Sequence, residues 1–215
     1  MKTFLLIGRI GNGKSTTGNK LLNKDAFTRG SRMDPITKQV QYEISADNKL
    51  MIFDCPGFGD VNDQLLFLEA FKNSKSALDS NSQVEGIILV VKFDKDQSNG
   101  FTGAVKEFLS AFSSMSIKSL MLLCIQGNNE LIYSQREFEG VLYNSEGYQF
   151  LKARNNNNDI PYCLWDNFNE YFEQTQNFNS AISRLQPLDG IALPYLFNFV
   201  EKEIENIKEK RGTTS

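Results

Sequence analysis

The segment Gly8-Arg9-Ile10-Gly11-Asn12-Gly13-Lys14-Ser15 decides the fold, because it matches the pattern G-x-x-x-x-G-K-[ST]. An apolar, strand-like run, Thr3–Ile7, precedes it, and Ser15–Leu22 can begin a helix directly after it. In such a unit the glycines let successive backbone N–H groups turn toward a phosphate, and the helix N-terminus adds partial positive charge. The segment therefore predicts a phosphate-binding loop. The residues expected to contact phosphate are Gly8, Arg9, Ile10, Gly11, Asn12, Gly13, Lys14, Ser15 and Thr16.

Lys14 and Ser15 have separate tasks in such a loop. The lysine would reach the β- and γ-phosphates of a nucleotide, and the serine hydroxyl would ligate Mg²⁺. A second apolar run, Leu50–Phe53, ends in Asp54, which we expect to hold the Mg²⁺ through a water. The Asp-x-x-Gly pattern then places Gly57 where its N–H can sense the γ-phosphate.

Thr37 lies in the polar segment Arg29–Lys38, before a possible edge strand at Gln39–Ile44. A threonine there can complete the Mg²⁺ shell when the γ-phosphate is present, and its departure after hydrolysis would free the loop. The expected metal ligands are therefore Ser15, Thr37 and Asp54.

Apolar runs recur along the chain and are typical of strands that are buried on both faces of a sheet. Segments with helical periodicity lie between them, as in Val105–Phe112. Strands that alternate with helices indicate an α/β fold, with helices on both faces of a mostly parallel central sheet. The expected strands are Thr3–Ile7, Leu50–Phe53, Ile87–Val91, Leu120–Ile125 and Tyr162–Trp165.

The length of 215 residues favours one domain, which we expect over residues 1–190. Residues 191–215 carry apolar side chains at helical spacing, so we expect a C-terminal amphipathic helix that packs on the domain or extends from it. The run of four asparagines, Asn155–Asn158, lies in a polar stretch and is expected to be an exposed loop.

The composition narrows the possible partners and chemistry. Lysine and arginine number 23 against 26 acidic residues, and this net charge of −3 argues against a nucleic-acid or membrane-surface partner. Histidine is absent, which excludes Ser-His-Asp and Cys-His catalysis and nearly all zinc sites. Three widely spaced cysteines indicate a reducing compartment, the cytoplasm. No apolar run approaches the roughly 20 residues of a membrane span.

Leu5–Phe27 resembles the opening of the immunity-associated nucleotide-binding GTPases, the IAN or GIMAP family. These proteins are relatives of the chloroplast Toc receptors and, more remotely, of the septins. The specific part of the resemblance is the Gly-Asn-Gly-Lys-Ser-x-x-Gly-Asn run, Gly11–Asn19, and later matches follow in order at Ile36–Lys38, Phe53–Phe58 and Tyr162–Cys163. The resemblance implies a three-layer P-loop GTPase fold, binding of GTP or GDP with Mg²⁺, and association of two copies through the nucleotide face.

Several positions depart from the family pattern. The family's fourth motif supplies an aspartate for guanine, and that position is Asn129 here. The last motif is Phe-Asn-Asn-like, and here it reads Trp165-Asp166-Asn167. An arginine that some members use for hydrolysis in trans is replaced by Lys95. The resemblance implies that the base is contacted by Asn129, Trp165, Asp166 and Asn167.

Asn129 would satisfy guanine poorly, because guanine presents two donors on one edge and an amide side chain offers one acceptor and one donor. A carboxylate accepts both donors, and two carboxylates lie near in sequence, Asp166 and Glu130. We prefer Asp166, which follows Trp165 at a strand end where the base should lie and where the indole could stack on the purine. Asp166 could instead only cap the following helix.

The combined pattern predicts a guanine-nucleotide-binding switch with slow, Mg²⁺-dependent GTP hydrolysis. Phe58 follows Asp-x-x-Gly, where many GTPases have a glutamine that orients the attacking water, and a phenylalanine cannot hydrogen-bond a water. We expect a homodimer in the triphosphate state, with Lys95 either near the partner's phosphates or simply solvated. The alternative is a nucleotide-dependent scaffold that binds GTP or GDP without meaningful hydrolysis. A small-molecule kinase is disfavoured, because its lid usually carries several arginines and here Arg136 and Arg154 are isolated.

Overall fold

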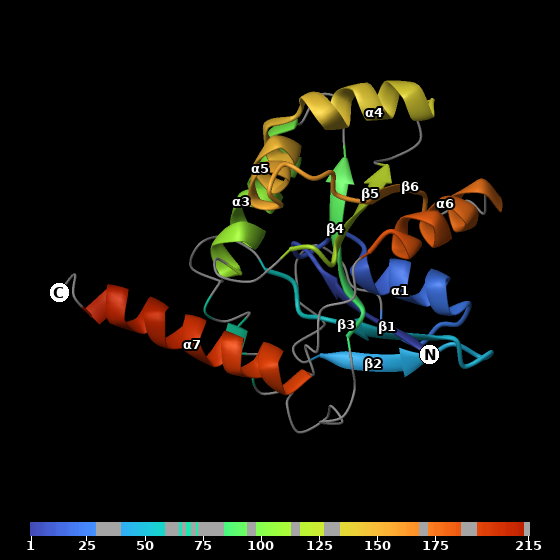
Figure 1. Cartoon of the computed structure of the whole chain (residues 1–215). Helices are drawn as coiled ribbons and strands as arrows, with labels where there is room; N and C mark the ends of the chain where they lie inside the picture. Colours follow the sequence, from blue (N-terminus) through green and yellow to red (C-terminus); the bar gives the residue numbers. More distant parts are fainter. Residues whose placement is uncertain are drawn as a thin grey trace.

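The structure, a computed structural model, describes residues 1–28, 40–58, 65, 68–69, 72, 84–93, 98–112, 117–126, 134–167, 172–185 and 193–212. Within these ranges six strands form one sheet that has helices on both faces (Figure 1). The strands are β1 (Lys2–Ile7), β2 (Gln41–Ile44), β3 (Leu50–Asp54), β4 (Gly86–Phe93), β5 (Leu120–Gln126) and β6 (Tyr162–Trp165). The helices are α1 (Lys14–Leu22), α3 (Ser98–Ala111), α4 (Gln135–Asn144), α5 (Glu146–Arg154), α6 (Phe172–Ser183) and α7 (Leu193–Gly212).

The sheet has the strand order β2-β3-β1-β4-β5-β6, and β2 at its edge runs antiparallel to β3. The other neighbours are parallel, which confirms the mostly parallel sheet predicted from the apolar runs. Strand β1 lies between β3 and β4. The strands that follow β1 in sequence are therefore added first on one side of it, as β2 and β3, and then on the other side, as β4, β5 and β6. Such a switch point places ligands outside the carboxyl ends of the strands. The loop after β1, the end of β3 and the loop after β6 all lie at this edge.

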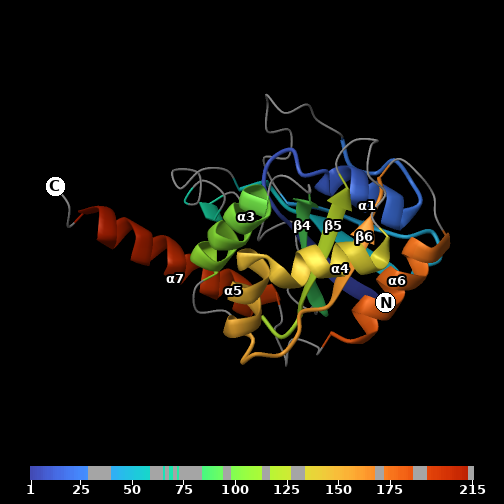
Figure 2. The same cartoon turned by 90° about the horizontal axis from the view of Figure 1, so that it is seen from above.

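Two apolar layers separate the sheet from its helices. Phe4 packs in one core cluster with Leu22 of α1 and Phe178 of α6. The next residue, Leu5, points to the other face and packs in a cluster with side chains of α3, α4, α5 and α7. Figures 1 and 2 show the same division, with α1 and α6 on one side of the sheet and α3, α5 and α7 on the other. The predicted three-layer fold is therefore confirmed.

Helix α7 is fastened to the rest of the protein along part of its length. Val200 and Ile204 are buried in the same core cluster as α3, and the Lys208 ammonium lies 2.8 Å from the Glu69 carboxylate. In both views the C-terminal end of α7 points away from the sheet. The division into residues 1–190 and 191–215 stays a prediction. None of the helices in the described part of the chain combines the length and the apolar character needed to cross a membrane.

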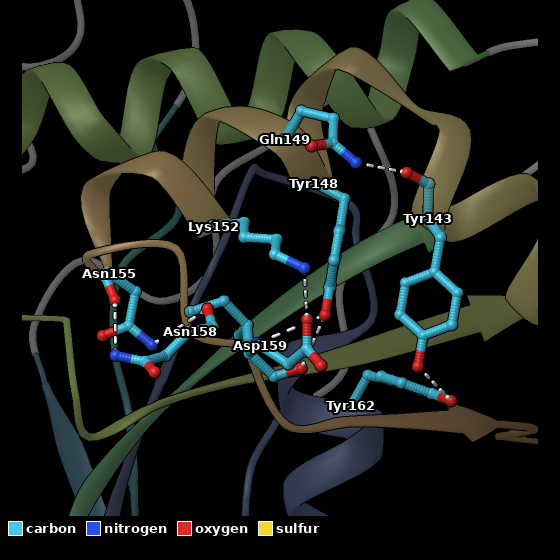
Figure 3. Close-up of polar contacts among 9 residues, drawn as sticks. Tyr143, Tyr148, Gln149, Lys152, Asn155, Asn158, Asp159 and Tyr162 are labelled. Carbon is cyan, nitrogen blue, oxygen red and sulfur yellow. Dashed lines mark hydrogen bonds and ion pairs between the residues drawn. The ribbon is translucent and has the colours of Figure 1, made fainter.

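The four asparagines form a turn between α5 and β6, and Asn156, Asn157 and Asn158 are exposed. Figure 3 shows the contacts between Asn155 and Asn158. Asn156 and Asn157 take positive φ angles of 55° and 62°, which asparagine adopts more readily than most residues. The Asn155 side chain donates to the Asn158 carbonyl at 3.3 Å, and the Asn158 side chain donates to the Asn155 carbonyl at 3.0 Å. The turn is therefore closed by its own amide groups.

Helix α5 occupies part of the polar stretch before the asparagines, where the sequence analysis predicts no helix. Ser145 separates it from α4: its hydroxyl donates to the Leu142 carbonyl at 2.6 Å and accepts from the Tyr148 N–H at 3.3 Å. Tyr148 is fully buried, and its hydroxyl donates to the Ile160 carbonyl at 3.4 Å and accepts from the Ile160 N–H at 3.3 Å (Figure 3). One tyrosine thus ties the beginning of α5 to the approach to β6.

Candidate functional site

The loop between β1 and α1 is held closely against β4. A Cβ at Gly8 would lie 2.3 Å from the Val90 carbonyl oxygen, so the backbones can approach this closely only with glycine. The Asn12 side-chain amide donates to the same carbonyl at 3.1 Å. Gly13 has a φ of 83°, and α1 begins at the next residue. The sequence therefore folds into an anchored loop that leads directly into a helix N-terminus, as phosphate binding requires.

Lys14 lies across this loop. Its ammonium donates to the carbonyl oxygens of Gly8 and Arg9, both at 3.1 Å, and the residue is only 7% exposed. Burial lowers the pKa of the Lys14 ammonium from its usual value, and the charge of Asp54 opposes that shift. The loop thus holds a positive group against its own backbone, beside the first turn of α1.

Ser15 in the first turn of α1 and Asp54 at the end of β3 are in direct contact beside the loop. The Ser15 hydroxyl donates to Oδ2 of Asp54 at 2.7 Å, and Asp54 is fully buried at the end of β3. A hydroxyl and a carboxylate are hard oxygen ligands of the kind that Mg²⁺ prefers. Within the described ranges, no group of three or more His, Cys, Asp or Glu residues could hold a metal ion. The pair suits Mg²⁺, which usually takes one or two protein ligands together with waters and substrate phosphates.

The Asp-x-x-Gly segment lies directly on the phosphate loop. The Ile10 N–H donates to the Phe58 carbonyl at 3.0 Å, and the Phe58 N–H donates to the Gly8 carbonyl at 3.3 Å. A Cβ at Gly57 would lie 2.7 Å from the Ile10 nitrogen, so this contact requires glycine. Phe58 is 2% exposed, which places its ring in the core and leaves no polar group there to orient a water.

Asn167, after β6, is joined to the phosphate loop and to α1. Its Oδ1 accepts from the Thr17 hydroxyl at 3.1 Å and from the Trp165 indole N–H at 3.0 Å. Its Nδ2 donates to the Gly13 carbonyl at 3.5 Å. The amide that the sequence analysis assigns to a base is therefore engaged by three protein groups.

Trp165 and Asp166 are positioned by different contacts. The indole is 3% exposed and packs edge-on against Phe178, with ring centroids 5.8 Å apart. This burial argues against the expected stacking of the indole on a purine. The Asp166 N–H donates to Oε1 of Gln174 at 3.1 Å, and its carbonyl accepts from the Lys20 ammonium at 2.7 Å. The backbone of Asp166 is therefore fixed between α1 and α6.

The structure also shows what Gly18 and Asn19 do, the two residues that end the Gly11–Asn19 run and for which the sequence analysis states no role. Asn19 is 3% exposed, and its Oδ1 accepts from the N–H groups of Ala26 and Phe27 at 3.0 and 2.7 Å. A Cβ at Gly18 would lie 2.7 Å from the Phe27 ring. The Gly-Asn pair that follows the phosphate motif thus fixes the chain after α1. The motif itself could have indicated these two residues, whereas no sequence signal points to Thr17, Lys20 or Gln174.

At the carboxyl edge of the sheet the structure brings together residues 8–16, Asp54, Gly57 and residues 165–167. The remaining predicted residues are Thr37, Lys95, Asn129 and Glu130, and all four lie outside the described residues. Their roles stay predictions.

Comparison with known structures agrees with the observed fold. A structure of the chloroplast translocon components atToc33 and psToc159 has a TM-score of 0.62 at 17% identity, covering 86% of this chain and 82% of that chain. Toc33 from Arabidopsis thaliana in complex with Mg²⁺ and GMPPNP has a TM-score of 0.54 at 16% identity, covering 95% of this chain and 85% of that chain. At such identities the likeness concerns the fold, which is that of a P-loop GTPase.

The sequence comparisons are more specific. Immune-associated nucleotide-binding protein 3 of Arabidopsis thaliana is 24% identical over 86% of this chain and 57% of its own length. Immune-associated nucleotide-binding protein 9 of the same plant is 29% identical over 66% of this chain and 41% of its own length. The chain therefore spans about half the length of these relatives. The profile of the AIG1 family matches residues 2–188, and the chain accordingly belongs to the AIG1 family.

Proposed function

We propose that this chain is a guanine-nucleotide-binding switch protein that hydrolyses GTP slowly with Mg²⁺ and self-associates across its nucleotide face. The observation that carries the proposal is the pairing of Ser15 with Asp54 at 2.7 Å beside a loop that holds Lys14. A cation for phosphate, a hydroxyl and carboxylate for Mg²⁺, and a helix N-terminus then lie at one edge of the sheet.

In this proposal residues 8–16 bind the phosphates, with Lys14 at the β- and γ-phosphates. Ser15 and Thr37 would ligate Mg²⁺, and Asp54 would hold it through a water. Bound Mg²⁺ supplies charge neutralisation on the phosphate oxygens. Gly57 and Thr37 sense the γ-phosphate. Gly57 is well suited to this role, because it contacts Ile10 of the phosphate loop directly.

For the base, we assign guanine recognition to the carboxylate of Asp166. The Asn167 amide already contacts Gly13, Thr17 and Trp165, and the Asp166 backbone already contacts Gln174 and Lys20. A carboxylate accepts from both N1–H and the 2-amino group of guanine, whereas an amide such as Asn129 accepts only one.

Slow hydrolysis follows from the chemistry around the γ-phosphate. Phe58 is buried and cannot orient the attacking water, so the remaining catalytic effects are positioning and charge stabilisation. An arginine finger is worth about three to five decades in rate. Lys95 of a second copy would supply charge without the bidentate fork of arginine.

Self-association is supported by two observations. Ile10 in the phosphate loop is one of the large apolar side chains that remain exposed, at 36%. In the structurally similar atToc33 and psToc159, dimerization is important for the GTPase activity of those proteins. We place the protein in the cytoplasm, which suits the free thiols of Cys55, Cys124 and Cys163.

The second candidate is a nucleotide-dependent scaffold that binds GTP or GDP without meaningful hydrolysis, and the burial of Phe58 favours it. A single-turnover assay with radiolabelled GTP separates the two, because the switch releases phosphate and the scaffold returns intact GTP. The assay uses protein purified with Mg²⁺, and the nucleotide that co-purifies is identified by chromatography. A protein that carries no nucleotide and binds neither GDP nor GTP in titration would contradict both candidates.

A further inference from the structure

The side chain of Arg9 leaves the phosphate loop and reaches α3. Its Nε donates to Oε2 of Glu107 at 2.7 Å, and its Nη2 pairs with Oε1 of the same carboxylate. The two side chains are 33% and 19% exposed, so the pair is partly shielded from water. A two-point contact between a guanidinium and a carboxylate fixes orientation as well as distance. The phosphate loop is therefore attached to α3 at Glu107, which lies 98 residues further along the chain than Arg9.

Gly103 provides the space for this contact. It lies four residues before Glu107 in α3, so the two positions share one face of the helix. A Cβ at Gly103 would lie 2.8 Å from Nη2 of Arg9, and the next nearest atoms also belong to that guanidinium. An alanine here would therefore displace the guanidinium, because the three atoms nearest to its Cβ all belong to that group.

The Arg9 carbonyl is one of the two backbone carbonyls that hold Lys14. The Arg9 carbonyl accepts from the Lys14 ammonium at 3.1 Å and from the Asn12 N–H at 3.2 Å. Glu107 holds the Arg9 guanidinium, and the Arg9 carbonyl accepts from the Lys14 ammonium. A chain of contacts thus runs from α3 to the lysine of the phosphate loop.

Helix α3 is itself held in place on two sides, so it can fix this series of contacts. Val105 and Phe108 are fully buried against the sheet. On another side of the helix, the Thr102 hydroxyl accepts from the Gly147 N–H of α5 at 3.2 Å. A Cβ at Gly147 would lie 3.0 Å from the Thr102 Cα, so the two helices are in close contact.

We propose that Arg9 and Glu107 form a positioning pair that holds the Arg9 carbonyl against Lys14 and so sets the affinity of the phosphate loop for nucleotides. This inference rests on the proposed nucleotide-binding function. Arg9 acts through its backbone and through Glu107, and its guanidinium is directed to α3.

The test variant is Gly103→Ala, which displaces the guanidinium while both charges stay in the protein. We expect at least threefold weaker binding of both GDP and GTP by fluorescence titration. Thermal unfolding without nucleotide should occur at the wild-type temperature or above it, because alanine is the better helix former. A purely structural role for the pair would instead lower stability and affinity together. Gly100→Ala is the matched control, since a Cβ at Gly100 of the same helix meets nothing within 4 Å.

Glu107→Gln is the second test and does not depend on the folding of the glycine variant. Removing a negative charge near the phosphates would by itself strengthen anion binding. Weaker binding by Glu107→Gln therefore reports the lost contact with Arg9. The double variant Gly103→Ala/Glu107→Gln should bind no more weakly than the weaker single variant, because both changes break the same contact.

Wild-type affinity in Gly103→Ala, or losses that multiply in the double variant, would overturn the inference. Lys14→Ala distinguishes this failure from failure of the proposed function. If Lys14→Ala loses binding while the pair variants keep it, only the inference is wrong. If Lys14→Ala also binds like the wild type, the phosphate site itself is wrong and the inference falls with it.

Discussion

Lys14 and Ser15 occupy adjacent positions, and in the proposed function they act on different parts of the nucleotide. Lys14 places a buried ammonium beside the loop carbonyls, and Ser15 directs its hydroxyl to Asp54. We expect Lys14→Ala and Ser15→Ala each to lower the affinity for GDP and GTP at least tenfold, about 1.4 kcal/mol or more, as measured by calorimetric titration with Mg²⁺. Lys152→Ala is the control, because Lys152 pairs with Asp159 at the surface, beside the asparagine turn. Titration curves like those of the wild type for both loop variants would contradict the assignment of this loop as a phosphate site.

Asp166 is the residue on which base preference depends in this proposal. We expect the wild type to bind GTP at least tenfold more tightly than ATP, and Asp166→Asn to lose most of that preference. Affinity for ATP should change little, because the phosphate contacts are retained. The physical reason is that an amide leaves one donor of guanine facing another donor, which costs roughly 1–3 kcal/mol in a dry site.

Competition titrations with GTP and ATP measure this preference. Equal competition by the two nucleotides in the wild type would contradict the guanine assignment. If Glu130→Gln alone shifts the preference, the carboxylate belongs to Glu130 and Asp166 only positions the loop.

Local motifs predict site residues well when the chemistry is contained in one short segment. The spacing from Gly8 to Ser15 predicts a loop between a strand and a helix, and the structure has that loop. The engagement of Asn167 by Thr17 and Gly13 could not be predicted, because it joins positions about 150 residues apart through tertiary packing. The burial of Trp165 has the same origin, since its neighbour Phe178 belongs to α6. A strand-end tryptophan looks the same in sequence whether it faces a ligand or the core.

At the scale of elements, Tyr148 determines how α5 meets β6. Its hydroxyl is hydrogen-bonded to both backbone groups of Ile160, which is itself buried (Figure 3). Tyr148→Phe should therefore lower the free energy of unfolding by about 1–3 kcal/mol, because two buried backbone groups lose their partner. Nucleotide affinity should be unchanged, since α5 lies apart from the phosphate loop. Chemical denaturation of the nucleotide-free protein measures the loss.

Tyr143→Phe is the matched control for this substitution. The Tyr143 hydroxyl donates to the Tyr162 hydroxyl at 3.1 Å, but the residue is 37% exposed and water can replace the contact. We expect a change within about 0.5 kcal/mol. If both variants lose the same free energy of unfolding, the hydrogen bonds to Ile160 do not contribute more to stability than the exposed contact of Tyr143.

The elements differ in how far their sequences predict them. Long apolar runs such as Leu120–Ile125 predict strands because burial on both faces leaves little room for polar residues. Helix α5 could not be predicted, because it is only nine residues long, has a weakly amphipathic sequence and begins directly after another helix. The double role of Ser145 as the end of α4 and the beginning of α5 becomes visible only when both helices are placed.

For the whole molecule, the sheet order explains why distant segments meet at one edge. The carboxyl ends of β1, β3 and β6 bring the phosphate loop, Asp54 and Asn167 together, while α3 reaches the same loop through Glu107. Among the described residues, the proposed nucleotide contacts all lie at this edge of the sheet. In the proposed dimer a second copy would meet the nucleotide by approaching this edge, and such an approach would also cover the exposed Ile10.

This geometry leads to a prediction about oligomeric state. The γ-phosphate would lie at the edge where two copies meet, so its charge can be neutralised from the partner. We expect more dimer with a GTP analogue than with GDP in analytical ultracentrifugation, and this difference should become smaller as salt screens the charges.

Lys95 lies in the segment between β4 and α3 and would bring its ammonium to the partner's phosphates. Lys95→Ala should then slow single-turnover hydrolysis, whereas Lys106→Ala in α3, whose ammonium lies 3.3 Å from Glu146, should not. One monomer mass in both nucleotide states would count against the dimer. If Lys95→Ala forms the dimer but hydrolyses GTP at the wild-type rate, Lys95 has no catalytic role, and the proposed association still stands.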